Sequence, residues 1–552
     1  MNTTDSWKRL YGYIRSISIV VFPVIFLMLA ILIHFSNGTF YLLNTDPEYF
    51  HFMNGLNLSI LNLAVDYIDH PGTTIEVLFA VSAHIVNLLF PGSDLISNAL
   101  SHPEAFIHGA NILLNIITAC ALFYLGYYTL KYTGNIPMAL LMQLTPFYSI
   151  RLLIVSGRIL PESAMIPVLI LLILLIIKYI YDAEQSRNRR MYVWAFAIIG
   201  GLGMATKLSY FPFLIIPLFL LNSKKRITQY LLYTLFAIII FAFPLFVNLG
   251  KSWRWYSNML LHSGQWGSGD TNFVDLTKVP GRLQQVFDVD PALFLLIGFA
   301  VLQLIIFYSL RFTQNNGRLT AFLKRSLIAV ISAVIIFVLF VTKHFAYHYI
   351  LPVLVFKAFV IFLMCSLILS VIGSKNIKKY FSLAVFLLTI LLIIPQLRYL
   401  GASVKIKQAQ AAKFEDRERM LDSYNTKDNL LIISSHYRGS PFMQTALAGG
   451  FMLSGQLRST FKKQLRETYP KTVLYVNWSE QFNIWDEFKN ADEFLDPQKS
   501  VYIFIGEGKE KDLRVIMDRI SSSYPAYSLE LEVVYAFKDP DETFYELKLH
   551  EK

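Results

Sequence analysis

Long apolar segments separated by short polar ones fill the first 400 residues of this chain. We interpret eleven of them as membrane spans, and runs such as SISIVVFPVIFLMLAILIHF are long enough for an α-helix to cross a hydrocarbon core of about 30 Å. They occupy 16–36, 104–130, 136–155, 162–182, 191–207, 210–222, 227–249, 291–310, 326–343, 349–371 and 379–397. The pattern predicts a mainly α-helical, polytopic membrane protein with about 11 transmembrane helices.

A further apolar segment at 74–90 is short and carries Glu76 and His84. Basic clusters decide its placement, because Lys and Arg concentrate in cytoplasmic loops. If 74–90 crossed the membrane, every later cluster would lie outside. We therefore predict interfacial helices in the first outer loop, 37–103, and a cytoplasmic N-terminus. The clusters are Lys8, Arg9 and Arg15; Arg187, Arg189 and Arg190; Lys224, Lys225 and Arg226; Arg318, Lys324 and Arg325; and Lys375, Lys378 and Lys379.

The chain changes character near residue 400. Short β-rich runs (NLLIIS, TVLYVNW, SVYIFIG and SLELEVVYAF) alternate with amphipathic stretches such as STFKKQLRETY and EKDLRVIMDRISSSY. This alternation predicts a compact α/β domain. The predicted organisation is a transmembrane domain at 1–399 and a soluble, extracytoplasmic α/β domain at 400–552.

Composition supports the membrane assignment and narrows the function. The chain is 55% hydrophobic and 16% charged, and its mean hydropathy is +0.48. The net charge of +11 is spread over short clusters between apolar runs, so we predict no nucleic-acid partner. Cys120 and Cys365 both fall inside predicted spans, which excludes a disulfide framework and a cysteine metal site. The first span lacks a small-residue cleavage site and is interpreted as an anchor.

Acidic residues stand out in the first outer loop. Asp46 and Glu48 flank Pro47, which prevents the preceding helix from continuing. A partly desolvated carboxylate at a membrane surface is suited to act as a general base toward a hydroxyl group. The alternative is that Asp46 and Pro47 only end a helix while Glu48 is solvated.

Asp69 and His70 precede a Pro-Gly turn that opens the interfacial helix. A helix N-terminus beside a histidine can bind an anion, although a capped turn would also explain these residues. Arg158 and Glu162 lie four residues apart around Pro161, either as a functional pair or as a helical salt bridge.

Two further polar positions fall at the outer ends of predicted spans. Lys207 follows Gly201 and Gly203, whose small size permits close helix packing. It could bind a lipid phosphate or extend to the interface. In the stretch 343–349, an aromatic belt explains Tyr347 and Tyr349 well, but it explains Lys343, His344 and His348 poorly.

These groups all fall on one outer face of the predicted topology. Sugar transfer from a polyprenyl-phosphate donor requires this combination, because the phosphate lies at the interface beside a lipid tail. Cations must stabilise the leaving phosphate while a carboxylate accepts the proton of the acceptor hydroxyl. Loop 250–290, with SWRWYSNMLLHSGQWGSGD, could cover the sugar or anchor at the interface.

The order of these motifs resembles the C superfamily of membrane glycosyltransferases, in the branch of protein O-mannosyltransferases and lipid A aminoarabinose transferases. The similarity covers about residues 1–400 and rests on the acidic motif, the HP turn, the Arg-x-x-Pro-acid motif, GLGMATK and YHYILP. The resemblance implies that Asp46 is the catalytic base and that Glu48 is the second acid of the loop. It implies donor-phosphate contacts by His70, Arg158, Lys207 and His348, with supporting roles for Asp69, Glu162 and Tyr347.

The sequence departs from the family pattern at three points. Pro71-Gly72 replaces the commoner Pro-Pro, Glu162 stands where aspartate is usual, and the acid pair is spaced D-x-E. The spacing leaves open whether a divalent cation, Mg²⁺ or Mn²⁺, bridges Asp46 and Glu48.

The sequence thus predicts an inverting glycosyltransferase of the plasma (inner) membrane and cell envelope. It moves a monosaccharide from a polyprenyl-phosphate donor to a hydroxyl of a lipid, glycan or protein acceptor on the extracytoplasmic face. Two alternatives stay open. One is a transporter or non-catalytic scaffold for lipid-linked sugars, and the other is a glycan ligase that uses a diphosphate-linked donor.

Overall fold

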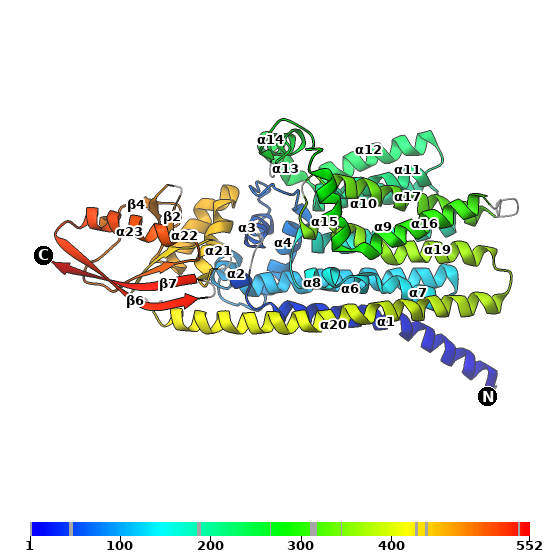
Figure 1. The fold of residues 1–552 in the computed structure, drawn as a ribbon, viewed down its shortest axis with the longest axis horizontal. Helices are drawn as coiled ribbons and strands as arrows, with labels where there is room; N and C mark the ends of the chain where they lie inside the picture. Colours follow the sequence, from blue (N-terminus) through cyan, green and yellow to red (C-terminus); the bar gives the residue numbers. More distant parts are fainter. Residues whose placement is uncertain are drawn as a thin grey trace. The chain divides into compact units, whose positions relative to one another are not determined.

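The structure, a computed structural model, describes most of the chain (Figure 1). The described residues are 3–43, 48–184, 189–264, 267–309, 317–343, 345–424, 429–436, 440–477, 479–538 and 541–552.

The chain forms two compact units, and each combines segments that are distant in sequence. The first contains 1–35, 68–78 and 110–403, and the second contains 36–67, 79–109 and 404–552. Most of the first outer loop therefore belongs to the same unit as the C-terminal tail. The sequence boundary at 399 between a transferase domain and an extracytoplasmic domain stays a prediction.

The first unit is helical. Its long helices are α1 (Thr3–Ser36), α6 (Pro103–Thr133), α9 (Pro161–Glu184), α10 (Arg189–Thr206), α12 (Lys224–Phe241), α16 (Pro291–Ser309), α17 (Arg318–Val341), α19 (Lys357–Val371) and α20 (Lys375–Asp422). The start of α6 and the end of α20, from residue 404, belong to the second unit. Shorter helices connect them: α7 (Ile136–Gln143), η1 (Thr145–Tyr148), α8 (Ile150–Ser156), η2 (Leu208–Leu214), α11 (Ile215–Leu220), α13 (Phe243–Val247), α14 (Leu249–Leu261), α15 (Val279–Val289), η4 (Tyr347–Ile350) and α18 (Leu351–Leu354).

Seven of the described helices are long and apolar enough to cross a membrane, judged by length and composition. The polytopic, mainly helical fold class is confirmed, whereas the predicted count of eleven spans is not. Predicted span 136–155 contains three short elements, α7, η1 and α8, because Pro146 lies between the two α-helices. Predicted span 210–222 is likewise divided between η2 and α11.

Close helix packing in the first unit depends on small residues. Helices α10 and α12 lie side by side (Figure 1). A Cβ atom at Gly201 of α10 would come within 2.4 Å of the Ala237 Cβ on α12, so any larger side chain would push the two helices apart. This observation agrees with the expectation that glycine permits close packing here.

In the second unit, the first outer loop forms α2 (Phe40–Leu43), α3 (Glu48–Ser59) and α5 (Leu95–Ser101), together with most of α4 (Thr73–Asn87). The predicted segment 74–90 corresponds to α4. Helix α3 packs on α21 (Met443–Met452) of the tail. A Cβ atom at Gly450 would lie 2.4 Å from the Tyr49 carbonyl oxygen, so only glycine allows this approach.

The tail forms a seven-stranded sheet in the order β4-β3-β2-β1-β5-β7-β6. Strands β1 (Leu430–Ser434), β2 (Thr472–Val476) and β5 (Val501–Ile505) are parallel neighbours, and the other pairings are antiparallel. The sequence predicted these three strands and β6 (Tyr527–Lys538). It missed β3 (Gln481–Asn483), β4 (Phe488–Lys489) and β7 (Asp541–Glu551).

Apolar residues cover both faces of the parallel strands, and β1 and β5 are buried along their whole length. The predicted amphipathic stretches form α22 (Arg458–Thr468) and α23 (Glu510–Ser523). The α/β character of the tail is therefore confirmed. A buried ion pair between Arg417 of α20 and Glu542 of β7 joins a helix to the sheet.

Candidate functional site

The turn that contains Asp69 and His70 is fixed by the first unit. The Ile68 carbonyl accepts a hydrogen bond from the Tyr256 hydroxyl at 2.8 Å, and the Thr74 hydroxyl donates to the Thr206 hydroxyl at 3.0 Å. Gly72 has φ +63°. Proline cannot adopt this value, because its ring holds φ near −65°. The glycine that departs from the Pro-Pro pattern is therefore required by the turn.

Lys207 directly follows α10, and its backbone is fixed on both sides. Its N–H donates to the Gly203 carbonyl at 3.0 Å, and its carbonyl accepts from the Tyr210 N–H at 3.0 Å. Its ammonium group binds the carboxylate of Glu162, which lies in the first turn of α9. Both side chains are buried, so each charge depends on the other.

A third group completes this cluster. His348, on η4, places its Nε2 3.8 Å from Glu162 Oε1, and His70 also interacts electrostatically with Glu162. Tyr349, next to His348, lies with its ring centre 4.5 Å from the Lys207 Nζ. The structure thus brings together His70, Glu162, Lys207 and His348, which are spread over nearly 280 residues of sequence.

A cavity with a volume of about 470 Å³ opens beside this cluster. Asp69, His70, Lys207 and Tyr349 line one part of it, and Lys343 adds a second lysine. The remaining wall is largely apolar and includes Phe211, Met259, Leu260, Phe273 and Phe340. A cavity that combines cations with a long apolar wall suits a ligand with an anionic head and a hydrocarbon tail.

Two residues of the cavity lining, Tyr349 and Lys343, and one that supports it, Arg282, were not among the predicted site residues. Tyr349 was explained as part of an interfacial belt, but its ring contacts Lys207. Lys343 donates to the Leu260 carbonyl at 2.7 Å and faces the Phe273 ring at 4.5 Å. Arg282 binds the Thr342 carbonyl at 2.8 Å and holds the backbone beside Lys343. The aromatic and basic content of loop 250–290 and of 343–349 was the only signal available.

Arg158 and Tyr347 are not among the residues that line this cavity. Arg158 is half-buried in the loop between α8 and α9, and α9 begins at Pro161, so Arg158 and Glu162 do not lie on one helix. Tyr347 is 61% exposed, and its ring lies 5.8 Å from the Arg151 guanidinium group instead of lining the cavity. Asp46 lies outside the described residues.

Glu48 is fully buried at the start of α3, in the second unit, and is therefore not a solvated acid. A second acid, Glu104, lies in the same unit and was not predicted. It accepts hydrogen bonds from the Tyr49 hydroxyl at 2.6 Å and from the Phe40 N–H at 2.8 Å. Burial, followed by the Glu104 charge, raises the pKa of Tyr49 well above its usual value. Tyr49 is therefore a neutral donor that orients Glu104.

Among the described residues, no group of three or more His, Cys, Asp or Glu side chains is arranged to bind a metal ion. Asp46 is outside this comparison, so a metal between Asp46 and Glu48 stays a prediction.

No family model and no curated protein matches the sequence. Solved structures do match the fold. The crystal structure of ArnT from Cupriavidus metallidurans in the apo state has a TM-score of 0.50 and 12% identity, and covers 95% of this chain and 97% of its own. The chain has the ArnT fold. ArnT from the same organism bound to undecaprenyl phosphate covers the same shares at a TM-score of 0.46 and 11% identity.

The ArnT fold confirms, at the level of architecture, the resemblance seen in the sequence. Lipid A aminoarabinose transferases belong to the branch of the superfamily that the sequence motifs resemble. At such low identity the likeness shows the fold and does not assign residues.

Proposed function

We propose that the protein is an inverting glycosyltransferase that uses a polyprenyl-phosphate sugar as donor. The cavity beside Lys207 is the observation that carries this proposal. It joins buried cationic groups to an apolar wall, and a lipid-linked phosphate needs both. The ArnT fold supports the same reaction class, and ArnT itself is known bound to undecaprenyl phosphate.

In the proposed reaction, the acceptor hydroxyl oxygen attacks the anomeric carbon while the bond from that carbon to the phosphate oxygen breaks. The phosphate leaves with the electron pair, and Asp46 accepts the hydroxyl proton. The role of Asp46 rests on the sequence resemblance. Because phosphate is a good leaving group, positioning and charge stabilisation supply most of the acceleration.

The cations of the cavity have distinct parts in this scheme. Lys207 has three N–H donors, so it can bind the leaving phosphate while one N–H stays on Glu162. His70 and Lys343 line the same cavity and add positive charge or hydrogen-bond donors. Arg158 and His348 are proposed to complete the phosphate contacts, with Asp69, Glu162 and Tyr347 in support.

The protein is proposed to act at the extracytoplasmic face of the plasma (inner) membrane on a lipid, glycan or protein hydroxyl. The test is sugar transfer by the purified full-length protein with a panel of polyprenyl-phosphate sugars. We expect Asp46→Asn to lower the transfer rate at least about 100-fold, because general bases typically accelerate a reaction by 10²–10⁴-fold.

Asp94→Asn is the matched control. Asp94 lies in the same loop and caps α5, and asparagine caps helices equally well. This variant should keep wild-type activity. If no donor in the panel is consumed while a diphosphate-linked glycan is transferred, the ligase alternative replaces the proposal. A donor that crosses the membrane unchanged, equally well in Asp46→Asn, would favour a transporter.

A further inference from the structure

A second cavity, with a volume of about 440 Å³, lies in the second unit at the carboxyl ends of the parallel strands. Ser435 and His436 follow β1, Asn477 follows β2, Lys509 lies beyond β5 (Val501–Ile505), and all four line it. β1 lies between β2 and β5, and the chain leaves β1 toward β2 but leaves β5 toward the opposite side of the sheet. Such a reversal in strand order marks the usual ligand position in open α/β sheets.

One wall of this pocket is the hairpin between β3 and β4. Ile484 and Glu487 exchange backbone hydrogen bonds at 2.9 Å and 3.2 Å across a two-residue turn. The central residues, Trp485 and Asp486, have φ +45° and +74°. Turns of this kind favour Asn-Gly, because left-handed backbone is strained for larger side chains. Strain of this type gathers at binding sites, where the surrounding structure enforces it.

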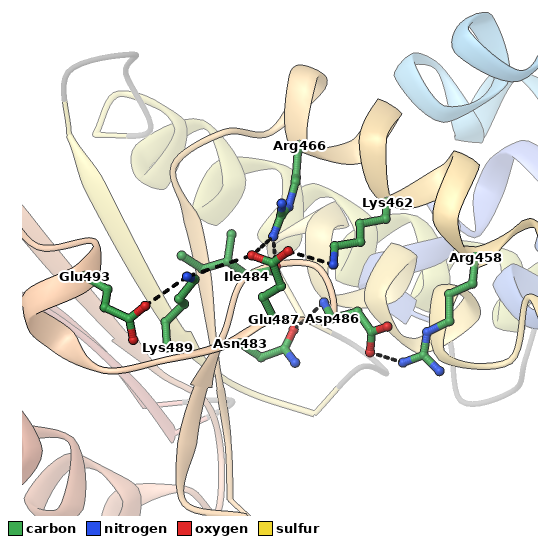
Figure 2. Close-up of polar contacts among 9 residues, drawn as sticks. All are labelled: Arg458, Lys462, Arg466, Asn483, Ile484, Asp486, Glu487, Lys489 and Glu493. Carbon is green, nitrogen blue, oxygen red and sulfur yellow. Dashed lines mark hydrogen bonds and ion pairs between the residues drawn. The ribbon is translucent and has the colours of Figure 1, made fainter.

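The strained turn is held firmly in place. Trp485 is 1% exposed, and its Nε1 donates to the Tyr469 carbonyl at 3.2 Å. Asp486 forms an ion pair with Arg458 of α22, and its N–H donates to Asn483 Oδ1 at 3.0 Å. Figure 2 shows Arg458 pointing from α22 toward the Asp486 carboxylate.

The neighbouring residue Glu487 ties the hairpin to the same helix. Its carboxylate forms an ion pair with the Lys462 Nζ at 2.8 Å and a second ion pair with the Arg466 guanidinium group (Figure 2). Basic residues at three successive turns of α22 therefore hold two successive acids of the hairpin. The pocket wall is preorganised before any ligand arrives.

The lining of the pocket suits a particular chemistry. Phe488 is 51% exposed and offers an aromatic face, and Asn477, which is also exposed, belongs to the same lining. Asn483, Asp486 and Arg458 supply planar amide, carboxylate and guanidinium groups. Such groups can form hydrogen bonds to two neighbouring hydroxyls at once, while an aromatic face packs on the C–H surface of a sugar ring.

Phosphate-bearing ligands fit this pocket poorly. Phosphate sites at this edge of a sheet commonly use a helix N-terminus, where backbone N–H groups and the helix dipole attract an anion. Here α23 carries Glu510 and Asp512 in its first turn, and Asp512 accepts a hydrogen bond from Ser434 at 2.7 Å. Their negative charge opposes an anion at this helix end, while of the basic groups in the lining Arg458 already pairs with Asp486, and Lys509 and His436 remain.

We propose that the pocket bounded by the β3–β4 hairpin binds a sugar ring of a neutral oligosaccharide. Phe488 packs against the ring, and Asp486 and Asn477 bind its hydroxyls. The inference does not depend on the reaction proposed above, since binding here requires no donor lipid.

The experiment uses the full-length protein in detergent. An array of neutral oligosaccharides that contain glucose, galactose, mannose, rhamnose or N-acetylglucosamine identifies the best ligand, and its affinity is then measured by titration. We expect Phe488→Ala and Asp486→Gly each to weaken this affinity at least tenfold. Asp486→Gly relieves the strained φ, so its unfolding temperature should not fall.

Glu480→Gly is the matched control. Glu480 also has a positive φ, at +52°, and the variant also loses an exposed ion pair, which Glu480 forms with Arg519 at 3.8 Å. Glu480 lies outside this pocket. It should bind the oligosaccharide as the wild type does. The proposal is overturned if no array member binds, if binding survives both pocket variants, or if ATP binds instead with the same dependence on Phe488 and Asp486.

Discussion

Lys207 is the residue on which the transmembrane cavity depends most. Its ammonium group is buried and touches both the Glu162 carboxylate and the Tyr349 ring. A buried charge is costly unless it is paired, and phosphate binding requires a cation whose position is already fixed. Lys207 therefore carries a structural role and a proposed binding role, which mutation must separate.

We expect Lys207→Met to lower the free energy of unfolding by about 3–5 kcal/mol, because Glu162 would remain as an unpaired buried carboxylate. Lys207→Met combined with Glu162→Gln should recover most of this loss. The double variant should nevertheless bind undecaprenyl phosphate much more weakly than the wild type. Thermal unfolding and native mass spectrometry measure the two effects.

Lys357→Met supplies the control for this pair of variants. Lys357 is also a buried lysine of the first unit, with its Nζ 2.5 Å from Asp290 Oδ2, but it does not line the cavity. Its loss should reduce stability and leave lipid binding intact in the folded protein. If the double variant bound undecaprenyl phosphate as tightly as the wild type does, Lys207 would not be part of the phosphate site.

Among the elements, the β3–β4 hairpin shows how charge fixes local geometry. Hydrogen bonds from Arg466, followed by Lys462, lower the pKa of Glu487 to about 2. A carboxyl group whose pKa is lower in the folded than in the unfolded chain stabilises the fold above its unfolded pKa. This contribution disappears as the pH falls through the folded value.

We therefore expect Glu487→Gln to lower the unfolding temperature at pH 6, where the carboxylate is ionised in both states. The difference from the wild type should shrink below about pH 4.5 and vanish near pH 2. Thermal unfolding followed by circular dichroism across this range is the measurement. Glu467→Gln, an exposed change on α22, is the control. A difference that stays constant with pH would contradict the role of the Glu487 charge.

The elements also show where sequence patterns fail. The predicted strand TVLYVNW and helix STFKKQLRETY are present as β2 and α22, because their periodicity is local. Strand β4 has two residues and β3 has three, which is too short for any alternation. Strand β7 was missed even though it pairs with β5 and β6, since its polar residues obscure the apolar face.

For the whole molecule, the basic clusters predict the side of the membrane on which each loop lies. The first cluster, Lys8, Arg9 and Arg15, predicts a cytoplasmic N-terminus, and an odd number of spans then places the tail outside. The seven long apolar helices establish a membrane protein, and the orientation stays a prediction.

Cysteine labelling tests this orientation. In a Cys120→Ser, Cys365→Ala background, Ser521→Cys on α23 should react with a membrane-impermeant maleimide in intact cells. Ser374→Cys, at another exposed serine, beside a basic cluster, should react only after the cells are permeabilised. The reverse pattern would invert the topology and move the proposed reaction to the cytoplasmic face.

The sequence by itself determined the membrane class, the alternating tail and a short set of candidate residues. It could do so because hydrophobic length, strand periodicity and loop charge act over neighbouring positions. Only the tertiary structure decided that Glu162 binds Lys207, 45 residues away, that Tyr349 lies against the same lysine, and that Trp485 and Asp486 form a strained pocket wall. Those outcomes depend on how helices and strands pack, and packing joins residues whose spacing along the chain carries no signal.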